Sequence, residues 1–212
     1  MAVHPAFQRR GIGTILMEHL LAWLDEHSCY EVALDATESG ALLYIRHGFV
    51  EREKSLVFYH HNAIKKNPSS FEQIGILHSC DLTDLAAFDR RLFGADRRTV
   101  FATLLRELPN RAFIARNQAG QIVGYLFAQS QKLGPWAAGT PTIAEALLLK
   151  VLLLSFDGTL RVLVPGANST AEKLLLRYGF KRQRTLCHMR RGGNAISNSR
   201  ALIYGMTNFA LG

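Results

Sequence analysis

Residues 3–24 read VHPAFQRRGIGTILMEHLLAWL, and the six residues QRRGIG (Gln8 to Gly13) decide how the rest is interpreted. The two glycines let the backbone turn tightly and approach a ligand without a clash from Cβ atoms. Apolar residues then recur at helical spacing, which predicts an amphipathic helix. Its inward side chains are expected to be Ile12, Ile15, Leu16, Leu20, Trp23 and Leu24. The first N–H groups of a helix are unpaired and lie at the positive end of its dipole. Together with Arg9 and Arg10, this start predicts a phosphate-binding loop.

A repeat links this region to a later part of the chain. The segments LYIRHGF (43–49) and LLLRYGF (174–180) share four of seven residues at an offset of 131 positions (174 − 43). At the same offset, the predicted helix 14–24 falls on 145–155. The elements follow one another in the same order in both copies, which favours a true internal repeat. The alternative is that two unrelated α/β units share this pattern.

The second copy has a front half that the first copy lacks. Its predicted elements are a strand at 71–78, helices at 81–94 and 97–110, and two strands within 111–130. The predicted domains are therefore a half unit at 1–62, a linker at 63–70 and a complete unit at 71–212. The expected fold class is α/β, with a mixed sheet.

The composition narrows the function classes. No apolar run approaches the roughly 18 residues that a membrane-spanning helix needs, so no membrane role is expected. The three cysteines are far apart and form no C-x-x-C pair, so we expect no metal site and a reducing, cytoplasmic setting. A net charge of +8 favours anionic partners. Because no long basic run occurs, a nucleic-acid role is only a remaining alternative.

The glycine loop has three other interpretations. It could be an ordinary strand-to-helix turn with solvated arginines. A Rossmann dinucleotide site is disfavoured because G-x-G-x-x-G is incomplete. A Walker A loop is disfavoured because Gly-Lys-Ser/Thr is absent.

The first copy resembles the GNAT superfamily of N-acetyltransferases. Gln8 to Gly13 match the Q/R-x-x-G-x-G/A motif of that family, and Leu43, Tyr44, Gly48 and Phe49 match its Leu-Tyr-x-x-x-Gly-Phe. The resemblance implies acetyl-CoA as acyl donor. It also implies that the loop holds the CoA pyrophosphate, through Gln8, Arg9, Arg10, Gly11, Ile12 and Gly13. The strand before the loop, here Val3, would pair with the pantetheine arm, and Tyr44 would protonate the departing thiolate.

Some positions depart from the family pattern. Thr37 stands where many members have an asparagine that contacts the cofactor, and it could keep one hydrogen bond. The second copy has Asn168 there, but Leu175 replaces the tyrosine and its loop reads GTPTIA (139–144). This copy resembles the degenerate C-terminal domain of bacterial two-domain GNAT proteins. We expect it to act as a scaffold or to shape the acceptor pocket.

The resemblance also implies what the first copy lacks. The resemblance implies that the first copy is an N-terminally truncated GNAT domain, from which we expect weak acetyl-CoA binding and poor turnover. The carboxylates near its strand, Glu31, Asp35 and Glu38, are interpreted as solvated charges, so no general base is assigned. The expected acceptor is an amine of a small molecule or peptide, and a homodimer is possible. The main alternative is a non-catalytic GNAT-like interaction module.

Overall fold

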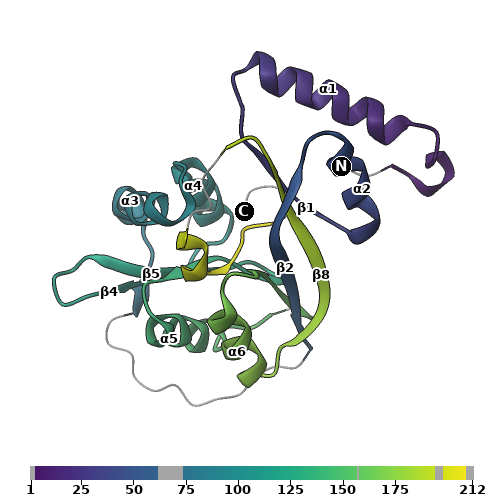
Figure 1. Cartoon of the computed structure of the whole chain (residues 1–212). Coiled ribbons are helices and arrows are strands. Elements are labelled where there is room, and N and C mark those ends of the chain that lie inside the picture. The colour runs from purple at the N-terminus through teal and green to yellow at the C-terminus, as the bar shows by residue number, and fades with distance from the viewer. Residues whose placement is uncertain (1–2, 62–73, 157, 194–197, 209–212) are drawn as a thin grey trace. The chain divides into compact units, whose positions relative to one another are not determined.

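The computed structural model describes residues 3–61, 74–156, 158–193 and 198–208 (Figure 1). Contacts between residues divide the chain into two compact units. Unit 1 is Met1–Lys54 with Leu186–Ala195, and unit 2 is Ser55–Thr185 with Ile196–Gly212. The division falls inside two long strands, β2 (Val50–His60) and β8 (Lys181–Arg191), so each of them contributes residues to both units.

Unit 1 consists of helices packed on a short antiparallel ladder. It contains the 3-10 turn η1 (Pro5–Phe7), α1 (Ile12–Glu26), β1 (Val32–Ala36) and α2 (Glu38–Arg46). Strand β1 pairs antiparallel with β8, so that Val32 lies opposite Arg191 and Ala36 opposite Cys187. The buried residues of its core are Met17, Leu21, Ala36, Ala41, Phe49, Cys187 and Met189.

Unit 2 is an α/β unit around a mixed sheet. In chain order its elements are β3 (Ile74–Ile76), η2 (Ser79–Asp81), α3 (Leu82–Phe93), α4 (Arg98–Glu107), β4 (Ala112–Arg116), β5 (Ile122–Ala128), β6 (Lys132–Ala138), α5 (Pro141–Val151), β7 (Leu160–Pro165), α6 (Ser169–Arg177), η3 (Asn198–Leu202) and β9 (Ile203–Gly205). Strands β3, β4, β5 and β6 pair antiparallel in sequence order. Strand β6 then pairs in parallel with β7, and β9 pairs antiparallel with β6.

Helices cover both faces of the sheet in unit 2. Figure 1 shows α3 and α4 on one face and α5 and α6 on the other. Alternate residues of a strand point to opposite faces, and the buried clusters follow this rule. Phe113 and Leu126 pack in the cluster with α5 and α6, whereas Ile114 and Tyr125 pack in the cluster with α3 and α4. The front half predicted for the second copy is therefore present and fully covered.

The two sequence copies exchange strands. Strands β2 and β8 are equivalent, because their first residues are 131 positions apart (181 − 50). Yet β1 of the first copy pairs with β8 of the second, and β7 of the second copy pairs with β2 of the first, with Ser55 opposite Pro165. Neither copy can therefore leave the other without breaking a backbone ladder.

The mixed α/β fold class predicted from the sequence is confirmed. The predicted helices at 81–94 and 97–110 correspond to η2 with α3 and to α4, and the two strands within 111–130 to β4 and β5. The predicted linker 63–70 lies outside the described residues, and the domain boundaries at 62 and 71 stay a prediction. The C-terminal strand β9 was not predicted.

The inward face predicted for α1 is wrong for most of its members. The buried residues of α1 are Met17 and Leu21, whereas Ile15, Leu16, Leu20 and Trp23 are exposed. Ile12 and Leu24 are half-buried. The apolar residues of α1 extend around more of the helix than its packing partners in unit 1 cover. Periodicity alone cannot indicate which part of such a wide apolar stripe is buried.

Candidate functional site

The loop before α1 has the backbone of a tight anion-binding turn. Arg9 has φ 62° and Gly11 has φ 76°, so two residues of this loop adopt the left-handed conformation. Gly11 is the N-cap of α1, and no side chain caps this helix. The side-chain amide of Gln8 donates a hydrogen bond of 3.0 Å to the Val3 carbonyl, which ties the loop to the segment before it. Successive N–H groups around left-handed residues form concave sites for anions.

The first turn of α1 has unpaired donors. The first bond of the helix runs from the Ile15 N–H to the Gly11 carbonyl, at 3.1 Å. Within the described part of the chain, the N–H groups of Ile12, Gly13 and Thr14 find no acceptor. No carboxylate lies in the first turn to balance the positive end of the dipole. This helix start can therefore accept a phosphate group from outside.

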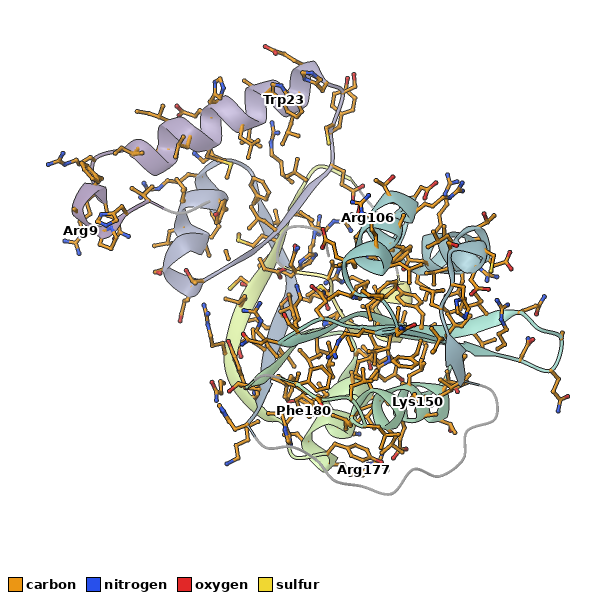
Figure 2. The ribbon with its side chains drawn as sticks, turned by 180° about the vertical axis from the view of Figure 1, so that it is seen from behind. Arg9, Trp23, Arg106, Lys150, Arg177 and Phe180 are labelled. Atoms are coloured by element: carbon orange, nitrogen blue, oxygen red, sulfur yellow. The ribbon has the colours of Figure 1, made fainter. Side chains whose placement is uncertain are left out.

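The side chains of the loop leave the backbone accessible. Arg9 and Arg10 are exposed, and Figure 2 shows Arg9 at the loop before α1. The Arg10 guanidinium lies 5.7 Å from the centre of the Phe7 ring. A Cβ on Gly13 would lie 3.5 Å from the Leu43 side chain, an ordinary van der Waals contact that places Leu43 of α2 beside the start of α1. The predicted loop residues are thus together in one place.

The predicted residues of α2 lie at its two ends. Thr37 is the N-cap, and its hydroxyl oxygen accepts a hydrogen bond of 3.1 Å from the Gly40 N–H. Tyr44 is half-buried, and its ring meets the edge of Phe49 with 5.8 Å between centroids. Among the described residues, none hydrogen-bonds the Tyr44 hydroxyl, so this O–H can donate to a ligand.

The equivalent helix start in unit 2 is closed. Thr140 is the N-cap of α5, and its hydroxyl oxygen accepts a hydrogen bond of 3.3 Å from the Ile143 N–H. Pro141 at the first helical position has no N–H to offer. The chain itself therefore removes one and satisfies another of the first three N–H positions of α5.

The gap between β6 and β7 is also filled in unit 2. The parallel pairing of these strands covers Lys132 and Leu133 only. Beyond it, β9 pairs with β6, and the Met206 N–H donates to the Leu163 carbonyl of β7 at 2.8 Å. Tyr204 of β9 lies 5.2 Å from Trp136, between ring centroids, and burial raises the pKa of its phenol. The C-terminal strand thus occupies the position between the two strands.

Asn168 of the second copy links the start of α6 to strand β9. The Asn168 side chain accepts a bond of 2.8 Å from the Ala171 N–H and donates one of 3.0 Å to the Ile203 carbonyl of β9. Both ends of its amide are therefore used inside the chain. Thr37, at the same place in unit 1, has no amide nitrogen to make the second bond.

One pair of residues was missed in the sequence. Asp35 was interpreted as a solvated charge, and this interpretation is wrong because its side chain is 4% exposed. Its carboxylate lies 3.3 Å from Nδ1 of His188, which stands opposite it in β8. The two residues are separated by 153 positions in the sequence, so only the exchanged strand brings them together. The alternation of side chains along VALDA (32–36) indicates that Asp35 points to the opposite face from Leu34. It does not indicate that His188 is the residue that Asp35 meets there.

Two segments of the chain match sequence models of a known protein family. Residues 85–205 match a model of the GNAT acetyltransferase domain, and residues 1–51 match a second model with the same description. The chain therefore belongs to the GNAT acetyltransferase family, with part of one GNAT domain followed by a second one.

Individual relatives agree with this assignment. YitH of Bacillus subtilis, described as an uncharacterized N-acetyltransferase, is 27% identical over 182 residues, which cover 84% of this chain and 63% of YitH. The chain thus spans less than two thirds of that relative. A crystal structure from Pyrococcus horikoshii is 26% identical and superposes with a TM-score of 0.84 over 100% of this chain and 70% of that chain. The fold is shared with a GCN5-related N-acetyltransferase from Sphaerobacter thermophilus, which is 21% identical with a TM-score of 0.66 and covers 92% of this chain and 73% of that one.

Two further observations concern other kinds of site. In the described part of the chain, none of the helices is both long and apolar enough to cross a bilayer. The same residues contain no group of three or more His, Cys, Asp or Glu side chains arranged to bind a metal ion.

Proposed function

We propose that this chain is an acetyl-CoA-dependent N-acetyltransferase whose acyl donor is held by unit 1. The observation that carries the proposal is the contrast between the two helix starts. The start of α1 has open N–H donors, left-handed residues at Arg9 and Gly11, and no acidic residue in its first turn. The start of α5 is capped by Thr140, and the neighbouring gap is filled by β9.

Each loop residue has a role in this proposal. The N–H groups of Gly11, Ile12 and Gly13 bind the pyrophosphate of the cofactor, with Arg9 and Arg10 adding positive charge. Gln8 keeps the loop in shape through its bond to the Val3 carbonyl. The backbone of Val3 and the hydroxyl of Thr37 contact the pantetheine arm.

The chemistry is acyl transfer to an amine. The amine nitrogen of a small molecule or peptide attacks the carbonyl carbon of the thioester, and the carbon–sulfur bond breaks. The departing thiolate takes a proton from the Tyr44 hydroxyl, because a positioned O–H lowers the cost of the developing negative charge on sulfur. The nitrogen passes its own proton to water as the amide forms, and Tyr44 regains a proton from water. Unit 2 serves as scaffold in this scheme.

A pair of matched glycine variants tests the proposal. Gly11 and Gly120 have φ values of 76° and 78°, and a Cβ at either position would meet no atom within 4 Å. Replacement by aspartate therefore strains both backbones equally, but only Gly11→Asp puts a carboxylate beside the loop. Calorimetric titration with acetyl-CoA should show affinity weakened at least about tenfold by Gly11→Asp and unchanged by Gly120→Asp. Equal affinities for the two variants would contradict the proposal.

A second candidate function is a non-catalytic interaction module. The observation that favours it is the set of apolar side chains on the exposed side of α1. Unchanged association behaviour after Leu16→Asp would argue against this alternative.

A further inference from the structure

The exposed side of α1 carries four large apolar residues. Ile15, Leu16, Leu20 and Trp23 are 64%, 45%, 43% and 50% exposed, and we call this set the outer face of α1. Figure 2 shows Trp23 on this helix. The opposite side of the same helix is buried through Met17 and Leu21. Apolar side chains gathered in this way mark surfaces that bind a partner.

The internal repeat shows what such a face normally meets. At the offset of 131 positions, Ile15, Leu16 and Leu20 correspond to Ala146, Leu147 and Val151 of α5. These three residues are 6%, 0% and 0% exposed. The other side is buried in both helices, since Met17 corresponds to Leu148 and Leu21 to Leu152. The two helices thus differ on one side only.

In unit 2, that side of α5 is covered by the front half of the fold. Helix α5 packs against β3, β4, β5 and β6. Leu147 reaches so close to β5 that a Cβ on Gly124 would lie 3.1 Å from its Cδ1 atom. An antiparallel sheet with a small residue under the leucine is therefore the surface that fits this face.

The edge of β1 gives a second, independent indication. Strand β1 stands at the end of the strand order, and its pairing within the described residues is with β8. Its equivalent β7 has a partner on each side, because β6 pairs in parallel with Arg161 and Val162. These positions correspond to Tyr30 and Glu31, which directly precede the first residue of β1, and Tyr30 is 69% exposed. Among the described residues, no strand pairs with β1 on the side away from β8.

The exposed apolar residues of α2 do not belong to this surface. Leu42 and Ile45 are exposed, but their equivalents in α6, Lys173 and Leu176, are exposed as well. Exposure at these positions is thus normal for the fold. Among the described residues, exposure that the second copy does not share is found on α1, at Tyr30 before β1, and at Phe7, whose equivalent Ala138 is buried.

We propose that the outer face of α1 and the edge of β1 form a docking surface for the front half of a GNAT domain, an antiparallel sheet built like β3–β6. Its last strand pairs in parallel with Tyr30 and Glu31, and its face covers Leu16 and Leu20. A second copy of this chain does not offer such a sheet, because its β3–β6 are covered by α5 on one face and by α3 and α4 on the other. The proposal rests on packing alone and stands even if acetyl-CoA does not bind.

The test adds such a sheet to the whole chain. Because residue 139 corresponds to residue 8, a second copy of residues 71–138 is joined directly to Gln8 of the chain that runs to Gly212. A second fusion has a Gly/Ser linker of about 12 residues at the junction, which removes strain there. Hydrogen exchange of peptides from 12–26 and 30–36 is then compared with that of the parent chain. Peptides from α5 report whether unit 2 remains folded.

The expected result is exchange slowed at least about tenfold in both peptides of the fusion. Leu16→Asp in the fusion should abolish the gain, while the same change in the parent should leave its exchange unaltered. No gain in either fusion would overturn the proposal, whether or not α5 stays protected. Protection of α1 that rises with concentration in the parent, and that Leu16→Asp removes, would identify a second copy as the occupant and would also overturn it.

Discussion

Helices α1 and α5 begin within two positions of equivalent points of the repeat, yet their first turns are completed in different ways. At α5 the Thr140 hydroxyl oxygen accepts from the Ile143 N–H, Pro141 has no N–H, and β9 fills the space between the flanking strands. At α1 the N-cap is Gly11 and the donors stay open. The difference shows that the same strand–loop–helix segment either closes on itself or keeps its backbone available to an anion. A handful of side chains decides between the two.

The same two helices also differ in what covers them. Leu147 of α5 is fully buried under a sheet, whereas the equivalent Leu16 of α1 is 45% exposed. The comparison therefore separates two features of α1. The open helix start depends on the residues of the helix and its loop, whereas the exposure of Leu16 depends on which elements pack beside the helix.

The largest expected effect comes from placing a charge at this pair of positions. Leu147→Asp buries an unpaired carboxylate and creates a cavity, so it should cost more than about 4 kcal/mol of unfolding free energy. Leu16→Asp should stay within about 0.5 kcal/mol, because surface changes are well tolerated. Urea denaturation followed by circular dichroism measures both. Equal losses would show that Leu16 is buried after all.

The next effect concerns the two helix caps that begin α2 and α6. Asn168→Ala loses the bond to the Ala171 N–H and leaves the Ile203 carbonyl without its donor, so we expect a loss of about 2 kcal/mol. Thr37→Ala loses only the bond to the Gly40 N–H and should cost about 1 kcal/mol or less. Thermal and urea denaturation of the two variants would rank them. A larger loss for Thr37→Ala would contradict the role given to β9.

A smaller effect is expected on catalysis by unit 1. Tyr44→Phe removes the proposed proton donor, so turnover should fall about tenfold or more, equivalent to about 1.4 kcal/mol. Its affinity for acetyl-CoA should stay the same in calorimetry. Tyr30→Phe, which changes an exposed phenol, is the matched control. Parallel loss of affinity and turnover would instead give Tyr44 a purely structural role.

The smallest effect concerns the charge of the loop. Arg9→Ala should weaken acetyl-CoA binding a few-fold at low salt and less at 0.5 M salt, because exposed charges are screened. Arg106→Ala, an exposed arginine on α4, should leave the affinity unchanged at both salt concentrations. Calorimetry at the two ionic strengths distinguishes a loop-specific contribution from the general effect of net charge.

Local sequence signals predicted much of the fold and of the loop. The cap residues Asp81 and Gly94 and the turn before Ile122 identified α3, β4 and β5 correctly. The glycines of the loop indicated an open helix start, and the structure brings Gln8 to Gly13 together there. Strand β9 was missed because three residues are too short for a period to be seen, and its place depends on β6.

The amino-acid sequence by itself determined the helices, most strands and the glycine loop, because each depends on neighbours a few positions away along the chain. It also determined the repeat, because matching residues recur at a fixed offset. Only the tertiary structure decided which strand pairs with which, that β9 fills one gap, that Asp35 meets His188, and that one side of α1 stays uncovered. These features depend on contacts between residues far apart in sequence. An apolar stripe indicates that the side chains on one side of a helix can be buried. Whether they are buried depends on whether another element packs against that side.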